Sequence, residues 1–175
     1  MTALGGVTVL VLVTLSSIVY LVMARRPRMA LLVLVSVVGA QLLSTALKHG
    51  FDRPRPELVP HGSYVYTASF PSGHAAMAAV TYLTLGALLA RAQPERRLKA
   101  FILGLAILIT LLVGFSRVYL GVHWPTDVLA GWTLGAGWAA LVGMVARMLQ
   151  ARGAIRGADP LQSDEAAASS ASLDL

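Results

Sequence analysis

Long runs without charged side chains alternate along the chain with short polar stretches. The uncharged runs cover residues 4–23, 29–47, 75–90, 100–116 and 128–146. A helix needs ~20 residues, each rising ~1.5 Å, to cross the hydrocarbon core of a bilayer, so the first, second and fifth runs fit directly. The third and fourth runs are shorter and need flanking residues. Because no run alternates in polarity as a membrane strand does, the pattern predicts an all-α, polytopic transmembrane helical bundle with about five spans.

The composition argues against a soluble domain. Of 175 residues, 57% are hydrophobic and only 13% are charged, and the mean hydropathy is +0.72. Arg25 and Arg26 follow the first run where a signal peptide would have small residues, so we expect a retained helix. The last stretch, 153–175, is rich in Ala, Ser and Asp without apolar periodicity. We expect it to be a disordered cytoplasmic tail, which leaves residues 1–152 as the membrane-embedded domain.

The basic residues are unevenly placed around the runs. Ten of the fourteen Lys and Arg residues follow the first, third and fifth runs: Arg25, Arg26, Arg28, Arg91, Arg96, Arg97, Lys99, Arg147, Arg152 and Arg156. The positive-inside rule makes these ends cytoplasmic and places the N-terminus outside. The net charge of +6 therefore reflects topology, and no nucleic-acid partner is expected. The other four, Lys48, Arg53, Arg55 and Arg117, lie on the outer face, where attraction to an anion accounts for them. Snorkelling from helix ends could explain Lys48 or Arg117 alone, but it does not explain why three segments converge.

Two of the outer polar stretches open predicted helices. In Pro71-Ser72-Gly73-His74, Ser72 is suited to the N-cap, and the free N–H groups of a helix start favour an anion. In the second stretch, the spacing of four between His123 and Asp127 places the carboxylate one helical turn from the imidazole. Such a carboxylate can accept the Nδ1 hydrogen and leave Nε2 as a nucleophile. Taken singly, an Asp favoured by the helix dipole explains Asp127 equally well.

Three motifs stand in order at the outer helix ends. They are Lys-x6-Arg-Pro from Lys48 to Pro56, Pro-Ser-Gly-His at 71–74, and Ser-Arg-x5-His-x3-Asp from Ser116 to Asp127. Together they resemble the three motifs of the type 2 phosphatidic acid phosphatase (PAP2) superfamily, and every fixed position is matched. The resemblance implies a membrane-embedded, metal-independent lipid phosphatase with no cofactor that works through a phosphohistidine, with the active site at the outer membrane face.

The resemblance also implies a role for each matched residue. His123 is expected to be the nucleophile, Asp127 its orienting partner, and His74 the acid that protonates the leaving oxygen and then activates water. The groups expected to hold the phosphate oxygens are Lys48, Arg55, Ser72, Gly73 and Arg117. Phosphoryl transfer needs mainly in-line positioning and charge neutralisation, which three cations supply. A metal is not expected, because the outer face offers only Asp52, Glu57 and Asp127 as carboxylates.

Other outer-face residues match no motif. Arg53 is expected to make a secondary headgroup contact, whereas His49 and His61 are expected to be solvated loop residues. Within the fifth run, Gly131, Gly135 and Gly137 resemble close-packing small residues, and contact inside one bundle is favoured over a dimer seam. Bacterial members of the family commonly have two helices before the one that carries the first motif, and here one apolar run precedes it. That departure leaves substrate entry between helices open.

The substrate is not determined by the motifs, because the pocket residues contact only phosphate. Phosphatidate, phosphatidylglycerol phosphate, polyprenyl diphosphates such as undecaprenyl diphosphate, and lipid A phosphate all fit, so the expected partners are a lipid phosphate and the membrane. The alternatives are a non-catalytic anion- or lipid-binding membrane protein, and an enzyme like the vanadate-dependent haloperoxidases of the same superfamily. We expect a multi-pass protein of the inner (plasma) membrane whose active site faces the periplasm or the extracellular side. The sequence assigns no oligomeric state.

Overall fold

The computed structural model describes residues 2–51, 53–56 and 68–151, all of whose regular elements are helical. A 3-10 turn, η1 (Thr2–Gly5), precedes five α-helices. These are α1 (Val7–Met23), α2 (Pro27–Phe51), α3 (Gly73–Arg91), α4 (Arg96–Tyr119) and α5 (Pro125–Ala151). The expected all-α bundle is confirmed for this part of the chain. The proposed tail at 153–175 lies outside the described residues.

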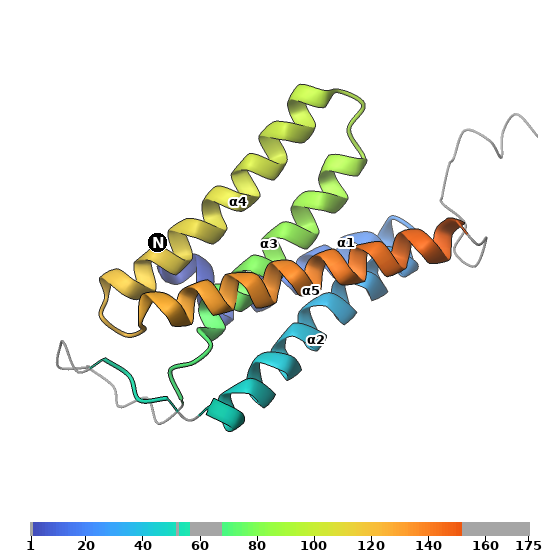
Figure 1. Cartoon of the computed structure of the whole chain (residues 1–175). Helices are drawn as coiled ribbons and strands as arrows, with labels where there is room; N and C mark the ends of the chain where they lie inside the picture. The colour runs from blue at the N-terminus through green and yellow to red at the C-terminus, as the bar shows by residue number, and fades with distance from the viewer. Residues whose placement is uncertain (1, 52, 57–67, 152–175) are drawn as a thin grey trace, which may run out of the picture.

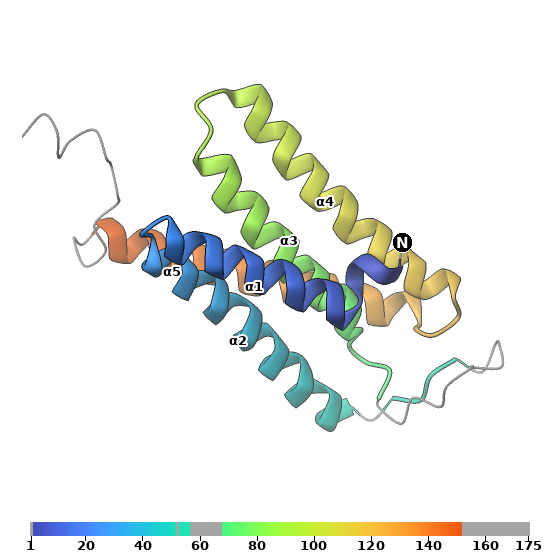
Figure 2. The same cartoon turned by 180° about the vertical axis from the view of Figure 1, so that it is seen from behind.

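Helix α3 lies at the centre of the bundle and contacts each of the other described helices. Figure 1 shows α5 crossing α3 and α2 on one side, and Figure 2 shows α1 lying against α2 on the opposite side. Alanines dominate the buried face of α3, where Ala75, Ala76, Ala78 and Ala79 are inaccessible to solvent. Small side chains let neighbouring helix backbones approach closely, which is a common way to associate helices in a membrane.

Four helices are apolar and long enough to cross a membrane: α2, α3, α4 and the part of α5 from Pro125 to Leu149. As expected, α3 and α4 extend beyond their uncharged runs and include flanking polar residues. Helix α1 has 17 residues and is shorter than the run at 4–23 that predicted it. Just before α1 begins, the chain packs tightly against α4 at Gly5, where an added Cβ would lie 2.3 Å from Val113 Cγ1.

The glycines of α5 divide into two kinds. A Cβ on Gly131 would lie 2.6 Å from the Ser72 carbonyl oxygen, and one on Gly135 would lie 2.4 Å from the Ala76 carbonyl oxygen. These two glycines therefore allow α5 to lie directly on the α3 backbone, as expected for contact inside one bundle. The same expectation is wrong for Gly137, whose Cβ position has no atom of the described residues within 4 Å.

Candidate active site

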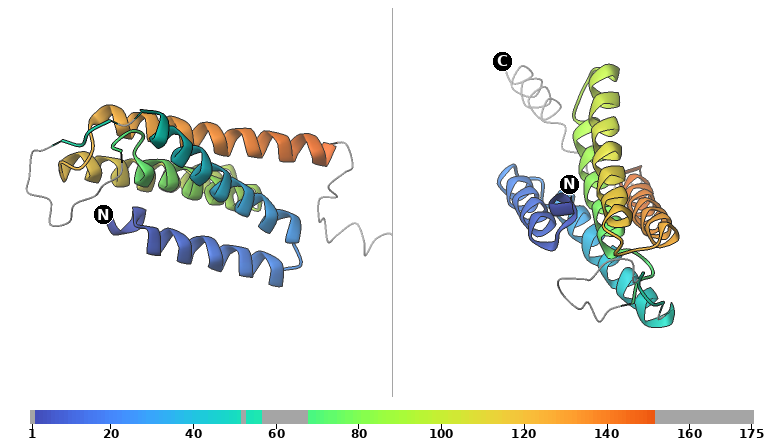
Figure 3. Two further views of the ribbon diagram at one scale, coloured as in Figure 1. Left: turned by 90° about the horizontal axis from the view of Figure 1, so that it is seen from below. Right: turned by 90° about the vertical axis from the view of Figure 1, so that its left-hand side faces the viewer.

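One end of the bundle gathers the ends of four helices. There α2 and α4 end while α3 and α5 begin, and Figure 3 (left) shows the α4–α5 turn at the end opposite the α1–α2 turn. The residues predicted to form the site all lie at this end: Lys48, Arg55, Ser72, Gly73, His74, Arg117, His123 and Asp127. The three sequence motifs are thus brought together in space. His49 is exposed near the end of α2, and His61 lies outside the described residues.

The start of α3 is joined directly to the start of α5. Ser72 occupies the N-cap of α3, as expected, and its backbone N–H donates to the Asp127 carbonyl oxygen over 2.9 Å. Its hydroxyl makes no capping hydrogen bond, unlike that of an ordinary N-cap serine. The Oγ atom is buried without a hydrogen-bond partner among the described residues. A buried, unpartnered hydroxyl at a helix N-terminus is well suited to bind a ligand oxygen.

His123 is almost completely buried, with 3% of its surface exposed. Burial, together with the charges of Arg55, Arg117 and Lys48, lowers its pKa from 6.5 to about 3, although Asp127 opposes this shift. The imidazole is therefore neutral near pH 7. The Arg55 Nη1 atom lies 3.4 Å from His123 Nε2. Because a guanidinium can only donate, this contact favours the tautomer with its lone pair on Nε2 and its hydrogen on Nδ1.

The contact between His123 and Asp127 differs from the direct hydrogen bond that the spacing predicts. The Nδ1 and Oδ2 atoms are 3.7 Å apart, which is too long for a hydrogen bond. The hydroxyl of Ser69 lies between them, donating to Asp127 Oδ2 and standing 3.4 Å from His123 Nδ1. Ser69 is fully buried. Its hydroxyl can accept the Nδ1 hydrogen while it donates to the carboxylate, so Ser69 links the imidazole to Asp127.

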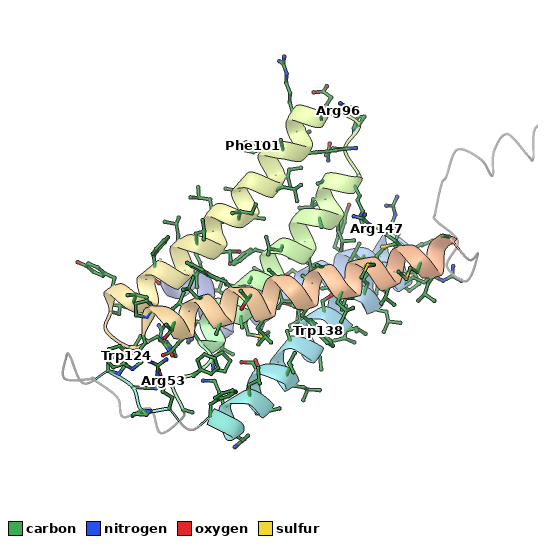
Figure 4. All side chains as sticks on the ribbon, viewed as in Figure 1. Arg53, Arg96, Phe101, Trp124, Trp138 and Arg147 are labelled. Atoms are coloured by element: carbon green, nitrogen blue, oxygen red, sulfur yellow. The ribbon has the colours of Figure 1, made fainter. Side chains whose placement is uncertain are left out.

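Arg53 has a different position from the expected headgroup contact. Its Nη1 atom donates to Asp127 Oδ1 over 2.8 Å and to Thr126 Oγ1 over 2.7 Å. The guanidinium carbon lies 5.7 Å from the centre of the Trp124 ring, and Figure 4 shows these two residues together beside the first turn of α5. Asp127 is wholly buried and also accepts the Trp124 N–H over 2.9 Å. Arg53 is thus the counterion of the buried carboxylate.

No motif singles out Ser69 for the role the structure gives it. It lies outside the three matched motifs, and its position between the imidazole and the carboxylate depends on the path of the chain before α3. The Ser69 N–H donates a hydrogen bond of 2.8 Å to the Arg53 carbonyl oxygen, which joins this segment to the one after α2. Its nearness to Ser72 in the sequence, with one aromatic residue and one proline between them, is the only local signal.

Three cations surround the space next to His123. Lys48 Nζ donates to the Ala68 carbonyl oxygen over 2.8 Å, and its Cε lies 3.7 Å from the Cβ position of Gly73. Arg55 Nη1 donates to the Val122 carbonyl oxygen over 3.1 Å. Burial lowers the pKa of Arg55, and Asp127 opposes that shift. Arg117 carries a buried Nε without a hydrogen-bond partner among the described residues.

The charge of the described site is strongly positive. Asp127 is its only carboxylate, and Arg53 already pairs with it. His74 lies at the start of α3, at the same end of the bundle as His123, and follows Gly73, whose Cβ position is 3.7 Å from Lys48 Cε. Within the ranges that the structure describes, no group of three or more His, Asp or Glu side chains is arranged to hold a metal ion. An end of the bundle that brings several cations and two histidines together is suited to bind a phosphate group.

Comparisons with known proteins agree with this geometry. A family model described as PAP2 superfamily matches residues 29–150. Phosphatidylglycerophosphatase B of Bacillus subtilis is 42% identical over 108 residues, which are 59% of this chain and 52% of that protein. Undecaprenyl-diphosphatase of Sulfolobus acidocaldarius is 34% identical over 121 residues, 66% of this chain and 54% of that protein. The chain therefore spans about half the length of these curated relatives.

Two solved structures share the fold. The crystal structure of a transmembrane PAP2 type phosphatidylglycerolphosphate phosphatase from Bacillus subtilis superimposes with a TM-score of 0.78 at 34% identity. That match covers 85% of this chain and 74% of the other. The crystal structure of Aquifex aeolicus LpxE gives a TM-score of 0.62 at 26% identity, covering 82% of this chain and 81% of the other. The helical arrangement is therefore that of membrane phosphatases of this type.

Proposed function

Because this chain belongs to the PAP2 superfamily, we propose that it is a membrane lipid phosphatase that hydrolyses the terminal phosphate of a lipid phosphate or diphosphate. The observation that carries the proposal is the state of His123, a buried neutral imidazole with its lone pair on Nε2, 3.4 Å from Arg55 Nη1, and with the charges of Arg55, Arg117 and Lys48 acting on it. A nucleophile needs that lone pair, and a phosphate needs those cations. A protein that only bound an anion would need the cations alone.

The proposed reaction has two displacements. The cations Lys48, Arg55 and Arg117 hold the phosphate oxygens, helped by the Ser72 hydroxyl and the N–H of Gly73. His123 Nε2 attacks phosphorus, the phosphorus–oxygen bond to the lipid breaks, and His74 gives its proton to the leaving oxygen. His74 then takes a proton from water, and the resulting attack on phosphorus breaks the phosphorus–nitrogen bond. Inorganic phosphate leaves and His123 returns to its neutral form.

Asp127 has its effect after the first attack. Phosphorylation at Nε2 leaves a positive imidazolium with its hydrogen on Nδ1. The Ser69 hydroxyl next to Nδ1 connects this charge to the buried carboxylate, which stabilises it. We propose that no metal takes part, since the described site offers one carboxylate and that one is engaged by Arg53.

An apolar groove beside the site supports a lipid substrate. It has a volume of about 480 Å³ and lies between α1 and α2, with walls that include Leu10, Leu34 and Val38. At one end it is closed by Gly73, His74 and Met77 at the start of α3. A groove that is apolar along its length and reaches a proposed catalytic imidazole matches a molecule with a phosphate head on an apolar chain.

The relatives narrow the substrate to a class. Their names specify phosphatidylglycerophosphate, undecaprenyl diphosphate and, for a relative from Rhizobium etli that is 31% identical over 116 residues, the 1-phosphate of lipid A. All three are phosphates on apolar anchors, so we propose that the substrate of this chain belongs to this class. The helix lengths and the family support a multi-pass membrane protein, and the excess of basic residues at the other end of the bundle supports a site facing the periplasm or the extracellular side.

The test is phosphate release by detergent-purified protein in EDTA. Phosphatidate, phosphatidylglycerol phosphate and undecaprenyl diphosphate are compared, with His123→Ala and, as a matched control, His49→Ala on the exposed end of α2. We expect release from at least one lipid by the wild type and by His49→Ala, and a loss of more than about 10³-fold in His123→Ala. Activity that persists in His123→Ala rules out the nucleophile. Activity that requires added magnesium rules out the metal-free reaction.

A further inference from the structure

A second cavity lies at the end of the bundle remote from the candidate active site. It has a volume of about 460 Å³ and is enclosed by α2, α3 and α5. Its walls are apolar and mostly small, with Leu32 on α2, Ala87 and Leu88 on α3, and Ala136, Ala140 and Gly143 on α5. None of these residues belongs to the motifs, and the proposed reaction does not use the cavity.

Two arginines line this cavity at its opening, at the end of the bundle remote from the candidate active site. Arg91 is the last residue of α3 and Arg147 lies on the last turns of α5, where Figure 4 labels it. An Nη atom of Arg91 lies 3.8 Å from the Cβ position of Gly143, so its guanidinium reaches across to α5. Arg147 lines the same cavity from α5. The two side chains therefore present two positive charges to the same opening.

These charges are not balanced within the described part of the chain. Neither arginine has an ion pair or a side-chain hydrogen bond there. The described ranges contain only two carboxylates, Glu95 and Asp127. Asp127 lies at the other end of the bundle and is paired with Arg53, and Glu95 forms no ion pair within those ranges. Two neighbouring guanidinium groups repel one another, and an anion bound between them would remove that repulsion.

We propose that this cavity binds one anionic phospholipid from the leaflet opposite the active site. The two guanidinium groups hold the phosphate of the headgroup, and one acyl chain lies along the small side chains of α5. The charged opening of the cavity suits the headgroup of such a lipid, and the apolar wall between membrane-spanning helices suits its acyl chain. A free phosphate would leave the apolar wall without a partner. The proposal does not depend on the proposed phosphatase activity.

The test compares lipid retention by native mass spectrometry of the full chain in detergent. The probes are dioleoyl-phosphatidylglycerol and dioleoyl-phosphatidylcholine, and the variants are Arg91→Gln/Arg147→Gln and Arg96→Gln/Arg97→Gln. The second variant removes two exposed arginines from the start of α4 that do not line the cavity. We expect the wild type and the α4 variant to prefer phosphatidylglycerol, and the cavity variant to bind it about 30-fold more weakly. Equal retention in both double variants overturns the proposal.

Three further arms identify the occupant. Gly143→Leu fills the cavity without removing a charge, so we expect it to weaken phosphatidylglycerol binding in the same way even if the double arginine variant does not fold. If phosphatidylglycerol retention falls in Lys48→Gln/Arg55→Gln and not in the cavity variants, the lipid occupies the candidate active site and the proposal is wrong. Neutralising the acidic residues at 159, 164 and 165 tests the tail as occupant. If lipid preference appears only after that change, the proposal is wrong.

Discussion

Gly131→Ala is expected to disturb both the stability of the bundle and the geometry of the site. The added Cβ would lie 2.6 Å from the Ser72 carbonyl oxygen and 3.1 Å from the Ala76 nitrogen. Both are backbone atoms of α3, so no side-chain rotation relieves the overlap. Ordinary contact begins at 3.4 Å, which requires α3 and α5 to separate by roughly 0.8 Å at this point. Overpacking of this kind costs about 1–3 kcal/mol.

The separation also alters the proposed phosphate site. Ser72 is hydrogen-bonded to Asp127 across this same contact and immediately precedes Gly73. A displacement approaching 1 Å in a phosphoryl-transfer site reduces the rate by up to about 100-fold. We therefore expect Gly131→Ala to lower the melting temperature of the detergent-purified protein by about 4–8 °C for a loss of ~2 kcal/mol, and to reduce kcat by about 10- to 100-fold.

Gly137→Ala is the matched control for this experiment. It makes the same change on the same helix, but its Cβ position has nothing within 4 Å. We expect its melting temperature and kcat to remain close to those of the wild type, since surface changes fall within about 0.5 kcal/mol. If Gly131→Ala behaved like Gly137→Ala in both measurements, close approach of α5 to α3 would not be what positions the site.

Three other changes test the site and the groove. Ser69→Ala should lower kcat by about 10- to 100-fold with little change in KM, and Ser69→Thr should recover part of the loss. If Ser69→Ala had the kinetics of the wild type, the hydroxyl would not link Asp127 to His123. Because the pKa of His123 is about 3 in the fold, the unfolded state binds a proton first as pH falls below 6.5. The free energy of unfolding should then drop by up to ~1.4 kcal/mol per pH unit between about pH 6.5 and pH 3. His123→Gln should weaken this pH dependence, which is measured by urea titrations at each pH. Val38→Trp should impair hydrolysis of long-chain lipids more than hydrolysis of short-chain phosphates. Val35→Trp is the control, because Val35 is similarly exposed on α2 but lies outside the groove. Equal effects of the two variants would show that the groove does not bind the substrate.

The helices were predictable because membrane spans follow directly from uncharged length. The run at 100–116 predicts α4 even though the helix itself extends from Arg96 to Tyr119. The start of α1 was not predictable in the same way. It lies next to a close contact between Gly5 and Val113, which are more than 100 residues apart, and apolar composition carries no information about such a contact. For the same reason, Gly131 and Gly137 look alike in the sequence and differ in the fold.

The candidate site was predictable as a set of residues and less so as a set of contacts. Motif spacing places His123 and Asp127 one turn apart, and they do lie close together. Spacing does not determine which donors reach the carboxylate, because the segment before α3 and the segment after α2 supply two of them, Ser69 and Arg53. Both segments are irregular, and their paths depend on tertiary contacts. A buried carboxylate nevertheless requires a counterion, so the presence of one could have been argued from Asp127 itself.

The pairing of Arg53 with Asp127 explains how one pocket can hold a carboxylate and still favour a phosphate. An unpaired Asp127 would attract Lys48 and Arg55 and would raise the pKa of His123 towards its protonated, non-nucleophilic form. With Arg53 as its counterion, Asp127 only partly opposes the effect of burial and of the nearby cations, and the imidazole stays neutral. The field of the remaining cations is then available to the phosphate. Once Nε2 is phosphorylated, the imidazolium charge forms next to Ser69, where the carboxylate can stabilise it. The ion pair thus separates binding of the phosphate from stabilisation of the intermediate, and Arg53→Gln should impair both.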